Sequence, residues 1–412
     1  MIKKLLNFLK MTGVSRDAPI GIQCLQKFNL SLCPRWQVNK LRCYQASVLM
    51  LTYFTYMTYH LTRKPISVLK SVLHQNCSAL PPPDWTPTND EWCNWPPFNT
   101  SDANTLLGAL DSAFLFSYAG AMFVSGMIAE RVDLRYFLSL GMLVSAFMCY
   151  LFGLARTLSI HHISYYLLVQ AGAGIAQTTG WPGTVSVVGK WFGDTKKGLI
   201  FGIWNSHTSL GNILGTVMAA EYVEGDWSQS FFYPALVMGA VGFLVFLFLA
   251  PEPSQKHYQF VVQQPSRQSR RSTDEEEPSQ VIVGDQYEDE SVSEHTSLLP
   301  PRGPAPASPS PVSLARALRI PGVIEFSMSL FFAKLVSYTF LYWLPLYIKS
   351  SSELSTAFDV GGVAGAIVAG LLADAVGVPA IVCVVFYALC APTVLTPVSV
   401  ATPGHWRRSP QS

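Results

Sequence analysis

The sequence predicts an all-α polytopic membrane protein, and three observations lead to this fold class. Half of the 412 residues are apolar and only 13% are charged, roughly half the charged share of an average soluble protein. Apolar stretches of about 20 residues recur along the chain, and each is long enough to cross a bilayer as a helix. The charged residues cluster in connectors and in one long polar segment. Because lipid offers no partner for unpaired backbone groups, each span is expected to be helical.

Nine spans are expected, six before the long polar segment and three after it. Their approximate ranges are 44–62, 104–128, 135–154, 164–188, 199–220, 231–250, 321–348, 355–373 and 378–397. The polar segment, 251–318, is rich in Pro, Ser and Gln and carries the acidic run Asp274–Glu277. This composition cannot bury enough apolar surface to offset the entropy of ordering, so we expect the segment to be disordered. A polar tail, 398–412, follows the last span.

Basic residues indicate the orientation of the spans. They cluster in alternate connectors, at Arg131, Arg135, Lys190, Lys196, Lys197, Arg316 and Arg319. Lys and Arg are enriched in cytoplasmic connectors. We therefore expect these connectors, the N-terminal tail 1–43 and the segment 251–318 to lie in the cytosol, and the loop 65–103 to face the lumen or the exterior.

The content of the loop 65–103 agrees with this orientation. It carries two glycosylation sequons, at Asn76 and Asn99, and two cysteines, Cys77 and Cys93. An oxidising compartment permits such a pair to form a disulfide. Short sequons also occur by chance, which is the alternative. The eight cysteines show no CxxC or Cys/His spacing, so neither a metal site nor a cofactor is expected.

A repeated pattern links the two groups of spans. The second span ends in Gly126-Met-Ile-Ala-Glu130-Arg131, and the eighth ends in Gly370-Leu-Leu-Ala-Asp374. In both, a glycine that permits close helix approach lies four residues before an acid on the same face. The acids and Arg131 are assigned a structural or gating role. The recurrence fits two parallel six-helix repeats, with a chance match as the alternative.

Four stretches carry a family resemblance. They are Tyr59–Pro65 (YHLTRKP), Gln177–Pro182 (QTTGWP) leading to Gly189–Gly193 (GKWFG), Gly202–Asn212 (GIWNSHTSLGN), and Ala333–Tyr338 (AKLVSY) followed by Tyr342–Pro345 (YWLP). In these stretches the chain resembles the major facilitator superfamily and, within it, the organophosphate:phosphate antiporters. It is most similar to the eukaryotic glucose-6-phosphate and glycerol-3-phosphate exchangers.

The resemblance implies a fold of two six-helix repeats. It also implies that the protein exchanges a phosphorylated sugar or glycerol phosphate for inorganic phosphate by alternating access, in the endoplasmic reticulum membrane. Family members have twelve spans and this chain supplies about nine, so a truncated second half is expected. The alternative function is therefore a non-transporting membrane protein that binds or regulates a full-length relative.

The carrier of a phosphate ester needs cations between its spans, where ionisable residues are rare and usually functional. Arg63 ends the first span, and His60 lies one turn earlier on the same face. A guanidinium matches phosphate oxygens in bidentate fashion. Alternatively, Arg63 and Lys64 only anchor the span at the interface. In the resembling antiporters the Arg of this pair binds the phosphate, which favours Arg63 as a ligand.

Lys334 and His207 complete the expected substrate-binding set. Lys334 lies in the middle of the seventh span, the repeat partner of the first, and can face Arg63 across the pseudo-two-fold axis. Bacterial relatives have an Arg where this chain has Ser337, so the role is carried over by analogy. A structural Lys paired with an acid is the alternative. Histidine changes charge near neutral pH, but the relatives have theirs at the position of Thr208, so His207 can equally be a packing residue.

The other candidates are structural, gating or sorting features. Asp111 and Asp359 lie at nearly equal depths and are expected to brace the cations or the gating helices. Gly180-Trp181-Pro182 is expected to kink the fourth span, because proline removes a backbone hydrogen bond. Glu294–Leu299 looks like an acidic dileucine signal, which makes an endolysosomal membrane the alternative location.

An enzyme is not expected, because the sequence offers no convincing nucleophile, metal cluster or phosphate-cradling glycine loop. The net charge of +2 gives no reason to expect a nucleic acid partner. The expected partners are small phosphorylated metabolites, inorganic phosphate and the lipid bilayer. The choice among hexose, triose and glycerol phosphates stays open, as does the oligomeric state.

Overall fold

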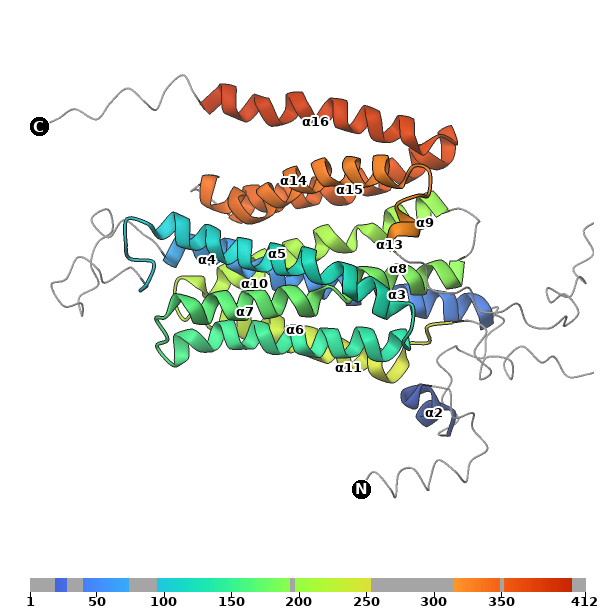
Figure 1. Cartoon of the computed structure of the whole chain (residues 1–412), viewed down its shortest axis with the longest axis horizontal. Coiled ribbons are helices and arrows are strands. Elements are labelled where there is room, and N and C mark those ends of the chain that lie inside the picture. The colour runs from blue at the N-terminus through green and yellow to red at the C-terminus, as the bar shows by residue number, and fades with distance from the viewer. Residues whose placement is uncertain are drawn as a thin grey trace, which may run out of the picture.

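The computed structural model describes residues 19–27, 40–73, 95–192, 197–252, 314–348 and 352–401. Most of these residues form helices that run roughly side by side, and the short helix α2 (Ile20–Lys27) lies at one end of the bundle (Figure 1). The first helix group consists of α3 (Lys40–Arg63), α4 (Pro65–Leu73), α5 (Ala103–Ala129), α6 (Leu134–Thr157), α7 (Ile163–Gln177), α8 (Gly180–Phe192), α9 (Lys197–Asn205), α10 (His207–Val223) and α11 (Gln229–Phe248).

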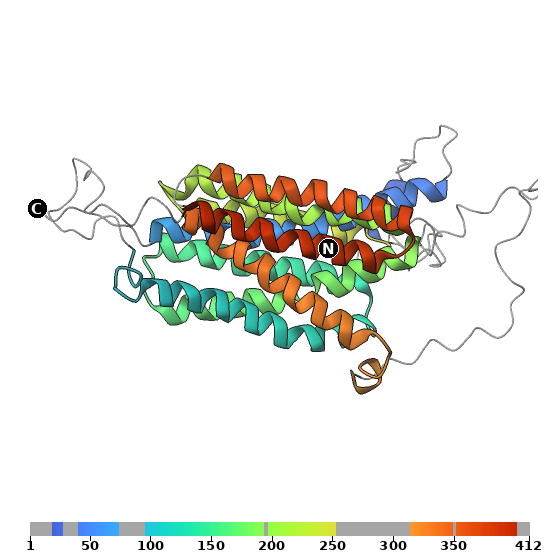
Figure 2. The same ribbon diagram turned by 90° about the horizontal axis from the view of Figure 1, so that it is seen from above.

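A second helix group covers one side of the first. After the short α13 (Leu314–Ala317) it contains α14 (Val323–Ile348), α15 (Ser352–Val376) and α16 (Pro379–Ala401). Helix α15 packs against α9 and α10, and α14 packs against α4. Helix α16 packs on α15, and the view from above shows α14 crossing its neighbours obliquely (Figure 2). The predicted all-α fold is thus confirmed; most of the segment 251–318 lies outside the described residues.

The fourth and fifth spans are each divided into two helices. In the fourth, α7 ends and α8 begins around residues 178–179, and Pro182 lies in the first turn of α8. A proline fits there because the first backbone N–H groups of a helix have no partner within it. In the fifth, α9 gives way to α10 at Ser206. These breaks leave polar backbone groups in the middle of the bundle.

The first span differs from its expected range, because the helix resumes directly after Arg63. The nine residues of α4, at the start of the expected loop 65–103, are helical. Their apolar side chains explain this, since Ile66, Leu69 and Leu73 recur at helical spacing and are all buried. The charged side chain of Lys70 is carried into the interior by the same helix.

Five helical segments among the described residues are long and apolar enough to cross a membrane. They are α5, α6, α11, Val323–Trp343 in α14 and Ala357–Val376 in α15. The fourth and fifth spans are not among them, because each is divided into two helices that are separately too short to cross a membrane. Helix α3 is long enough but more polar, since it buries Thr52, Thr55, Thr58, His60 and Thr62. Interior polar residues of this kind are expected where a membrane helix faces other helices rather than lipid.

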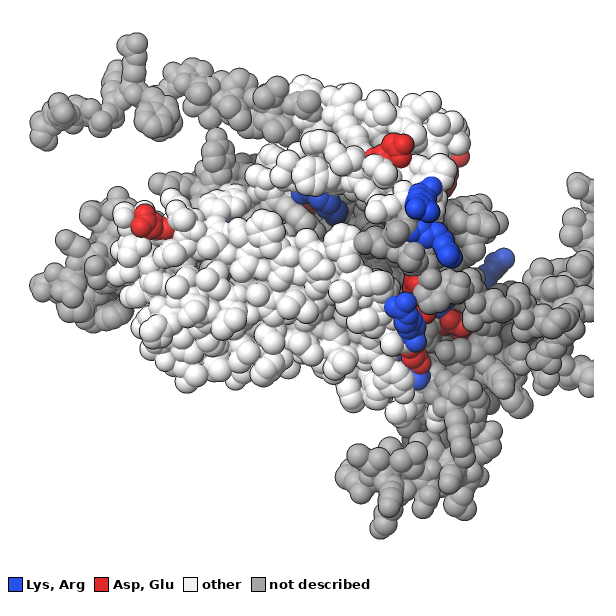
Figure 3. Space-filling model, viewed as in Figure 1, with Lys and Arg blue, Asp and Glu red and all other residues white. Residues whose placement is uncertain are grey.

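Charged side chains gather at one end of the molecule (Figure 3), where the connectors that follow α5 and precede α14 lie. The exposed basic residues there include Arg131, Arg316 and Arg319. Most of the middle of the visible face carries no charged side chain, apart from a basic group in the hollow below the second helix group (Figure 3). Large apolar side chains, such as Phe116 and Leu168, are exposed on the surface of the molecule. An uncharged band between polar ends is the surface that a bilayer requires.

Helix α10 approaches α3 closely at two glycines. A Cβ atom at Gly215 would lie 2.7 Å from the carbonyl oxygen of Leu61 and 2.9 Å from the Cβ atom of Lys64. Gly211, one turn earlier, touches the backbone of Met57 in the same way. Small residues spaced by four positions let membrane helices pack backbone to backbone. This contact fixes α10 against the end of α3 that carries Arg63.

Gly215→Ala is expected to push α10 away from α3 and to lower the melting temperature of the purified chain in detergent by several degrees. Overpacking of a buried contact costs about 1–3 kcal/mol. Gly189→Ala is the matched control, because a Cβ atom there would meet nothing within 4 Å. Thermal unfolding followed by size-exclusion chromatography measures both variants, and equal melting temperatures would contradict the close packing.

Candidate functional site

Arg63, the last residue of α3, is held in the interior by an amide and two aromatic rings. The residue is only 4% exposed. Its Nε donates a hydrogen bond to Oε1 of Gln177 at 2.5 Å. The guanidinium carbon lies 5.4 Å from the ring centroid of Phe114 and 4.9 Å from that of Tyr118, and aromatic faces suit this planar cation. Its Nη2 has no hydrogen-bond partner among the described residues.

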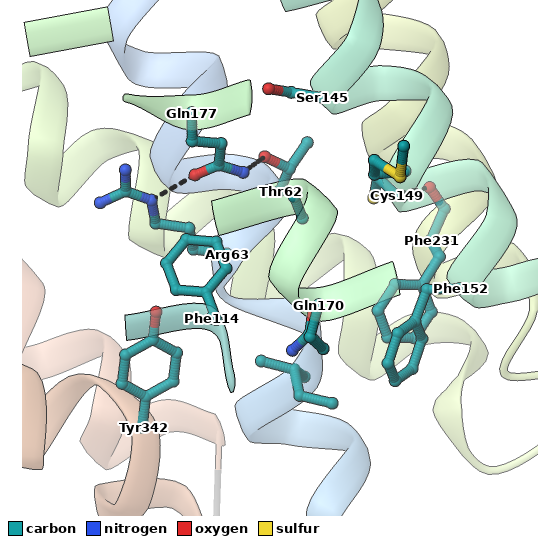
Figure 4. A pocket seen from close by; sticks show the side chains of 13 residues that line it. Thr62, Arg63, Phe114, Ser145, Cys149, Phe152, Gln170, Gln177, Phe231 and Tyr342 are labelled. Atoms are coloured by element: carbon teal, nitrogen blue, oxygen red, sulfur yellow. Dashed lines mark hydrogen bonds between the residues drawn. The ribbon is translucent and has the colours of Figure 1, made fainter. Parts of the chain in front are cut away.

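A small cavity lies beside Arg63, lined by the first helix group and by Tyr342 of α14 (Figure 4). Its polar lining includes Thr62, Ser145, Gln170 and Gln177. The space open to the centre of a water molecule is about 20 Å³, which suits roughly one water and is far too small for a sugar phosphate. In Figure 4 the terminal nitrogens of Arg63 point away from Ser145 and the apolar wall of the cavity. The guanidinium therefore does not point into this cavity.

Lys64, the next residue, reaches across to the second helix group. Its Nζ donates to the carbonyl oxygen of Leu341 in α14 at 3.4 Å. Within a helix this carbonyl would accept from the backbone N–H four residues later, but that residue is Pro345, which has none. The proline thus frees an acceptor, and a lysine from the first helix group binds it. The same Nζ lies 3.9 Å from Oδ2 of Asp359.

Lys70, on α4, makes a second bridge to α14. The residue is fully buried and forms an ion pair with Asp111 of α5. Its Nζ also donates to the carbonyl oxygen of Tyr342 at 3.2 Å and lies 4.1 Å from the ring centroid of Trp343. A buried ammonium requires such compensation, because its removal from water is costly. Asp111 and Asp359 therefore each lie against a lysine of the first helix group.

His60 begins a chain of polar contacts that leads to Asp359. Its Nδ1 lies 3.2 Å from Oδ1 of Asn212, and Nδ2 of Asn212 donates to Oδ1 of Asp359 at 2.9 Å. Because an ionised carboxylate only accepts, the asparagine must present its NH₂ group to Asp359 and its oxygen to His60. This arrangement places a proton on Nδ1 of His60. The chain connects α3, α10 and α15, and so joins the two helix groups.

His207 lies inside a cage of aromatic rings at the start of α10. Its ring centroid is 4.4 Å from that of Trp204, 4.7 Å from that of Tyr56 and 5.7 Å from that of Tyr53. The residue is fully buried, and its Nε2 has no hydrogen-bond partner among the described residues. The cage favours a packing role, while the unpartnered nitrogen leaves one polar atom to contact a ligand.

Lys334, the remaining predicted ligand, lies on α14. The residue is exposed, and its Nζ lies 5.5 Å from the ring centroid of Tyr338. Of the four residues predicted to bind substrate, His60 and His207 lie together against the ring of Tyr56, with ring centroids 5.4 Å and 4.7 Å from it, Arg63 follows His60 on α3, and Lys334 comes from the second helix group.

Four cationic side chains lie where the two helix groups meet, and they differ in whether a carboxylate lies nearby. Lys64 and Lys70 each lie within 4.0 Å of a carboxylate. Among the described residues, Arg63 and Lys334 have no carboxylate within that distance. One of these two comes from each helix group. Together their charges can match the charge of about −2 that a phosphate monoester carries.

The predicted structural and gating residues are distributed differently. Trp181 is 43% exposed, and its ring contacts those of Tyr56 and Trp204, next to the His207 cage. Glu130, Arg131 and Asp374 lie exposed at helix ends. A Cβ atom at Gly126 would meet nothing within 4 Å, so the close helix approach expected at this glycine is not present among the described residues.

Several predicted features cannot be placed. Asn76, Cys77, Cys93 and the segment Glu294–Leu299 lie outside the described residues. Asn99 is described and is partly exposed, in the short segment before α5. The glycosylation sites, the disulfide and the sorting signal therefore stay predictions.

Three residues of the site were not among the sequence candidates, namely Lys70, Gln177 and Asn212. Lys70 interrupts the apolar run from Ile66 to Leu73. The helical spacing of the apolar residues in that run is the signal that could have placed Lys70 on a helix. Gln177 and Asn212 stand in the two quoted motifs of the fourth and fifth spans. Buried amides in apolar helices are expected to find polar partners, which is the signal that marks them.

Comparison with known proteins identifies the family. The profile of the Major Facilitator Superfamily matches residues 49–408. The glucose-6-phosphate exchanger SLC37A2 of Bos taurus is 47% identical over 360 residues, which cover 85% of this chain and 72% of that protein. SLC37A2 of Danio rerio is 46% identical over 359 residues, which cover 85% of this chain and 70% of that protein. The glucose-6-phosphate exchanger SLC37A1 of Mus musculus is 38% identical over 426 residues, which cover 94% of this chain and 78% of that protein.

These matches agree with the helical architecture and the apolar flanks, and they confirm the resemblance seen in the motifs. Members of this family are transporters rather than enzymes, and they are integral membrane proteins. The chain belongs to the major facilitator superfamily, in the group of the eukaryotic sugar-phosphate exchangers.

Proposed function

We propose that the chain is an antiporter that exchanges a phosphorylated sugar or glycerol phosphate for inorganic phosphate by alternating access. The observation that carries this proposal is the pair of cations without carboxylate partners, Arg63 and Lys334, contributed by opposite helix groups. The names of the relatives, which are glucose-6-phosphate exchangers, support a phosphorylated hexose as one of the substrates.

In this proposal the phosphate group binds between Arg63 and Lys334. The terminal nitrogens of the guanidinium offer a fork to two oxygens, and the lysine supplies a point charge. The rings of His60 and His207 both lie against that of Tyr56, and the unpartnered Nε2 of His207 offers the ligand a further contact. A ligand that contacts both helix groups stabilises the state in which they are close. Without the anion, two like charges oppose that state, which favours exchange over transport in one direction.

Alternating access requires the two helix groups to separate at one end at a time. We propose that the contacts of Lys64 and Lys70 with the carbonyl groups of Leu341 and Tyr342 form a gate where α4 meets α14. Hydrogen bonds to charged groups contribute about 1.5–3 kcal/mol each. Two such bonds are strong enough to favour the closed gate and weak enough to be replaced by water when it opens.

The orientation and the compartment are also proposals. The endoplasmic reticulum membrane is proposed, with the residues 65–103 in the lumen and the tail 1–43 in the cytosol. The basic side chains at one end of the bundle support this orientation. An endolysosomal membrane is the alternative, and immunofluorescence of the tagged chain against markers of both compartments separates the two.

Arg63→Ala is expected to reduce phosphate exchange in proteoliposomes by roughly 100-fold, because it removes the charge-assisted fork to the phosphate, worth on the order of 3 kcal/mol. Uptake of radiolabelled phosphate into vesicles preloaded with phosphate measures the effect. The matched control is Arg131→Ala, an exposed arginine at a helix end, which should keep normal exchange. Full activity of an Arg63→Ala variant that reaches the membrane would overturn this assignment.

Pro345→Ala is expected to lower the maximal exchange rate about tenfold, equivalent to about 1.4 kcal/mol, with little change in KM. Alanine restores the backbone N–H, so that the carbonyl of Leu341 returns to the helix and Lys64 loses its acceptor. Initial rates over a range of phosphate concentrations measure both constants. Pro234→Ala, at a buried proline inside α11, is the control. Unchanged rates for Pro345→Ala would contradict the proposed gate.

A further inference from the structure

The hydrogen bond between Gln177 and Arg63 assigns a role to a residue outside the cationic set. Gln177 is 3% exposed, and its Oε1 accepts from Nε of Arg63 at 2.5 Å. Its Nε2 donates to Oγ1 of Thr62 at 3.3 Å. Both ends of the amide are therefore used, which fixes the side chain between two consecutive residues of α3 (Figure 4).

The backbone around Gln177 is fixed just as firmly. Gln177 is the last residue of α7, and the break that follows it leaves backbone groups without helical partners. The carbonyl oxygen of Thr178 accepts from Oγ of Ser125 at 2.9 Å, and Oγ1 of Thr179 lies 2.8 Å from the hydroxyl of Tyr59. The break is thus held by side chains from α5 and α3. A residue at this place cannot shift without disturbing three helices.

This arrangement restricts how Arg63 can point. Nε is bound by Gln177, and the ring faces of Phe114 and Tyr118 hold the plane of the guanidinium. The terminal nitrogens point away from the cavity wall formed by Ser145 and its neighbours (Figure 4). Nη2 is buried and has no hydrogen-bond partner among the described residues. Nη2, at the end of the side chain that can bind phosphate oxygens, therefore keeps an unused hydrogen-bond donor.

The hydrogen-bond partner of Arg63 is a neutral side chain, and this lack of charge matters as much as its position. Lys64 and Lys70 are each paired with a carboxylate, whereas Arg63 is held by a neutral amide. A carboxylate at this position would hold Nε equally well, but its charge would cancel that of the guanidinium and compete with an anionic ligand. An amide orients the cation and leaves its charge available.

We propose that Gln177 is the positioning residue that orients Arg63 without neutralising it, so that the guanidinium is presented to the oxygens of a phosphate group. The inference rests on the proposed function, because it concerns the same phosphate site. It also explains why the site would select an anion. Gln177 orients the guanidinium of Arg63 but, being neutral, does not cancel its positive charge.

Two variants of nearly equal size separate orientation from charge. Gln177→Glu keeps the acceptor and adds a negative charge, so KM for inorganic phosphate is expected to rise at least tenfold, roughly the effect of one lost charge-assisted contact, while the melting temperature is unchanged or higher. Gln177→Met removes the acceptor without adding charge, so KM is expected to rise about three- to fivefold and the melting temperature to fall slightly. Radiolabelled phosphate exchange in proteoliposomes and thermal unfolding in detergent measure the two quantities.

Gln229→Glu is the control for the same chemical change, because Gln229 lies at the start of α11 and its side chain donates to Asp226 at an exposed place outside the cavity. It should leave KM within about twofold of the wild type. A Gln177→Glu variant with the wild-type KM, beside a wild-type chain that exchanges phosphate, would overturn the inference and leave the proposed function standing. A correctly inserted wild-type chain that neither binds nor exchanges phosphate would overturn both.

Discussion

Three cationic side chains are removed from water inside the helix bundle, and the acceptors that they require determine how the helices around them pack. Arg63, Lys64 and Lys70 are each no more than 4% exposed, and such burial is costly without nearby acceptors. The protein meets this cost in three different ways. Aromatic faces and an amide surround Arg63, a proline-freed carbonyl and a carboxylate receive Lys64, and an ion pair holds Lys70.

These acceptors explain why the two helix groups dock where they do. The carbonyl groups that receive Lys64 and Lys70 belong to α14, and Asp359 belongs to α15. The charges of the first helix group are therefore fully compensated only when the second group is in place. Irregular backbone is tolerated in a membrane only where it is buried in protein or lines a cavity. The break after Gln177 and the proline in α14 both lie inside the protein, as this rule requires. They provide hydrogen-bonding groups that the side chains of the site use.

Much of the fold could be predicted from the sequence, and part of the site could not. Apolar length and the placement of Arg and Lys predicted a helix bundle with charged ends, and the motifs predicted the family. Helix α4 was missed because a luminal loop was expected after Arg63, although the spacing of Ile66, Leu69 and Leu73 is helical. Arg63 and Lys334 stood out as charges within apolar spans. Gln177 and Asn212 did not, because an uncharged amide shows its role only through the partners that tertiary packing gives it.

We propose that cations from both helix groups bind a phosphate group, which the chain exchanges across a membrane. The most direct test is counter-flow of radiolabelled phosphate into proteoliposomes that contain this 412-residue chain and are preloaded with phosphate or glucose-6-phosphate. Uptake above that of empty liposomes is expected with either preload. Correctly inserted protein that gives no uptake would contradict the proposal, and would favour a membrane protein that binds or regulates a relative instead.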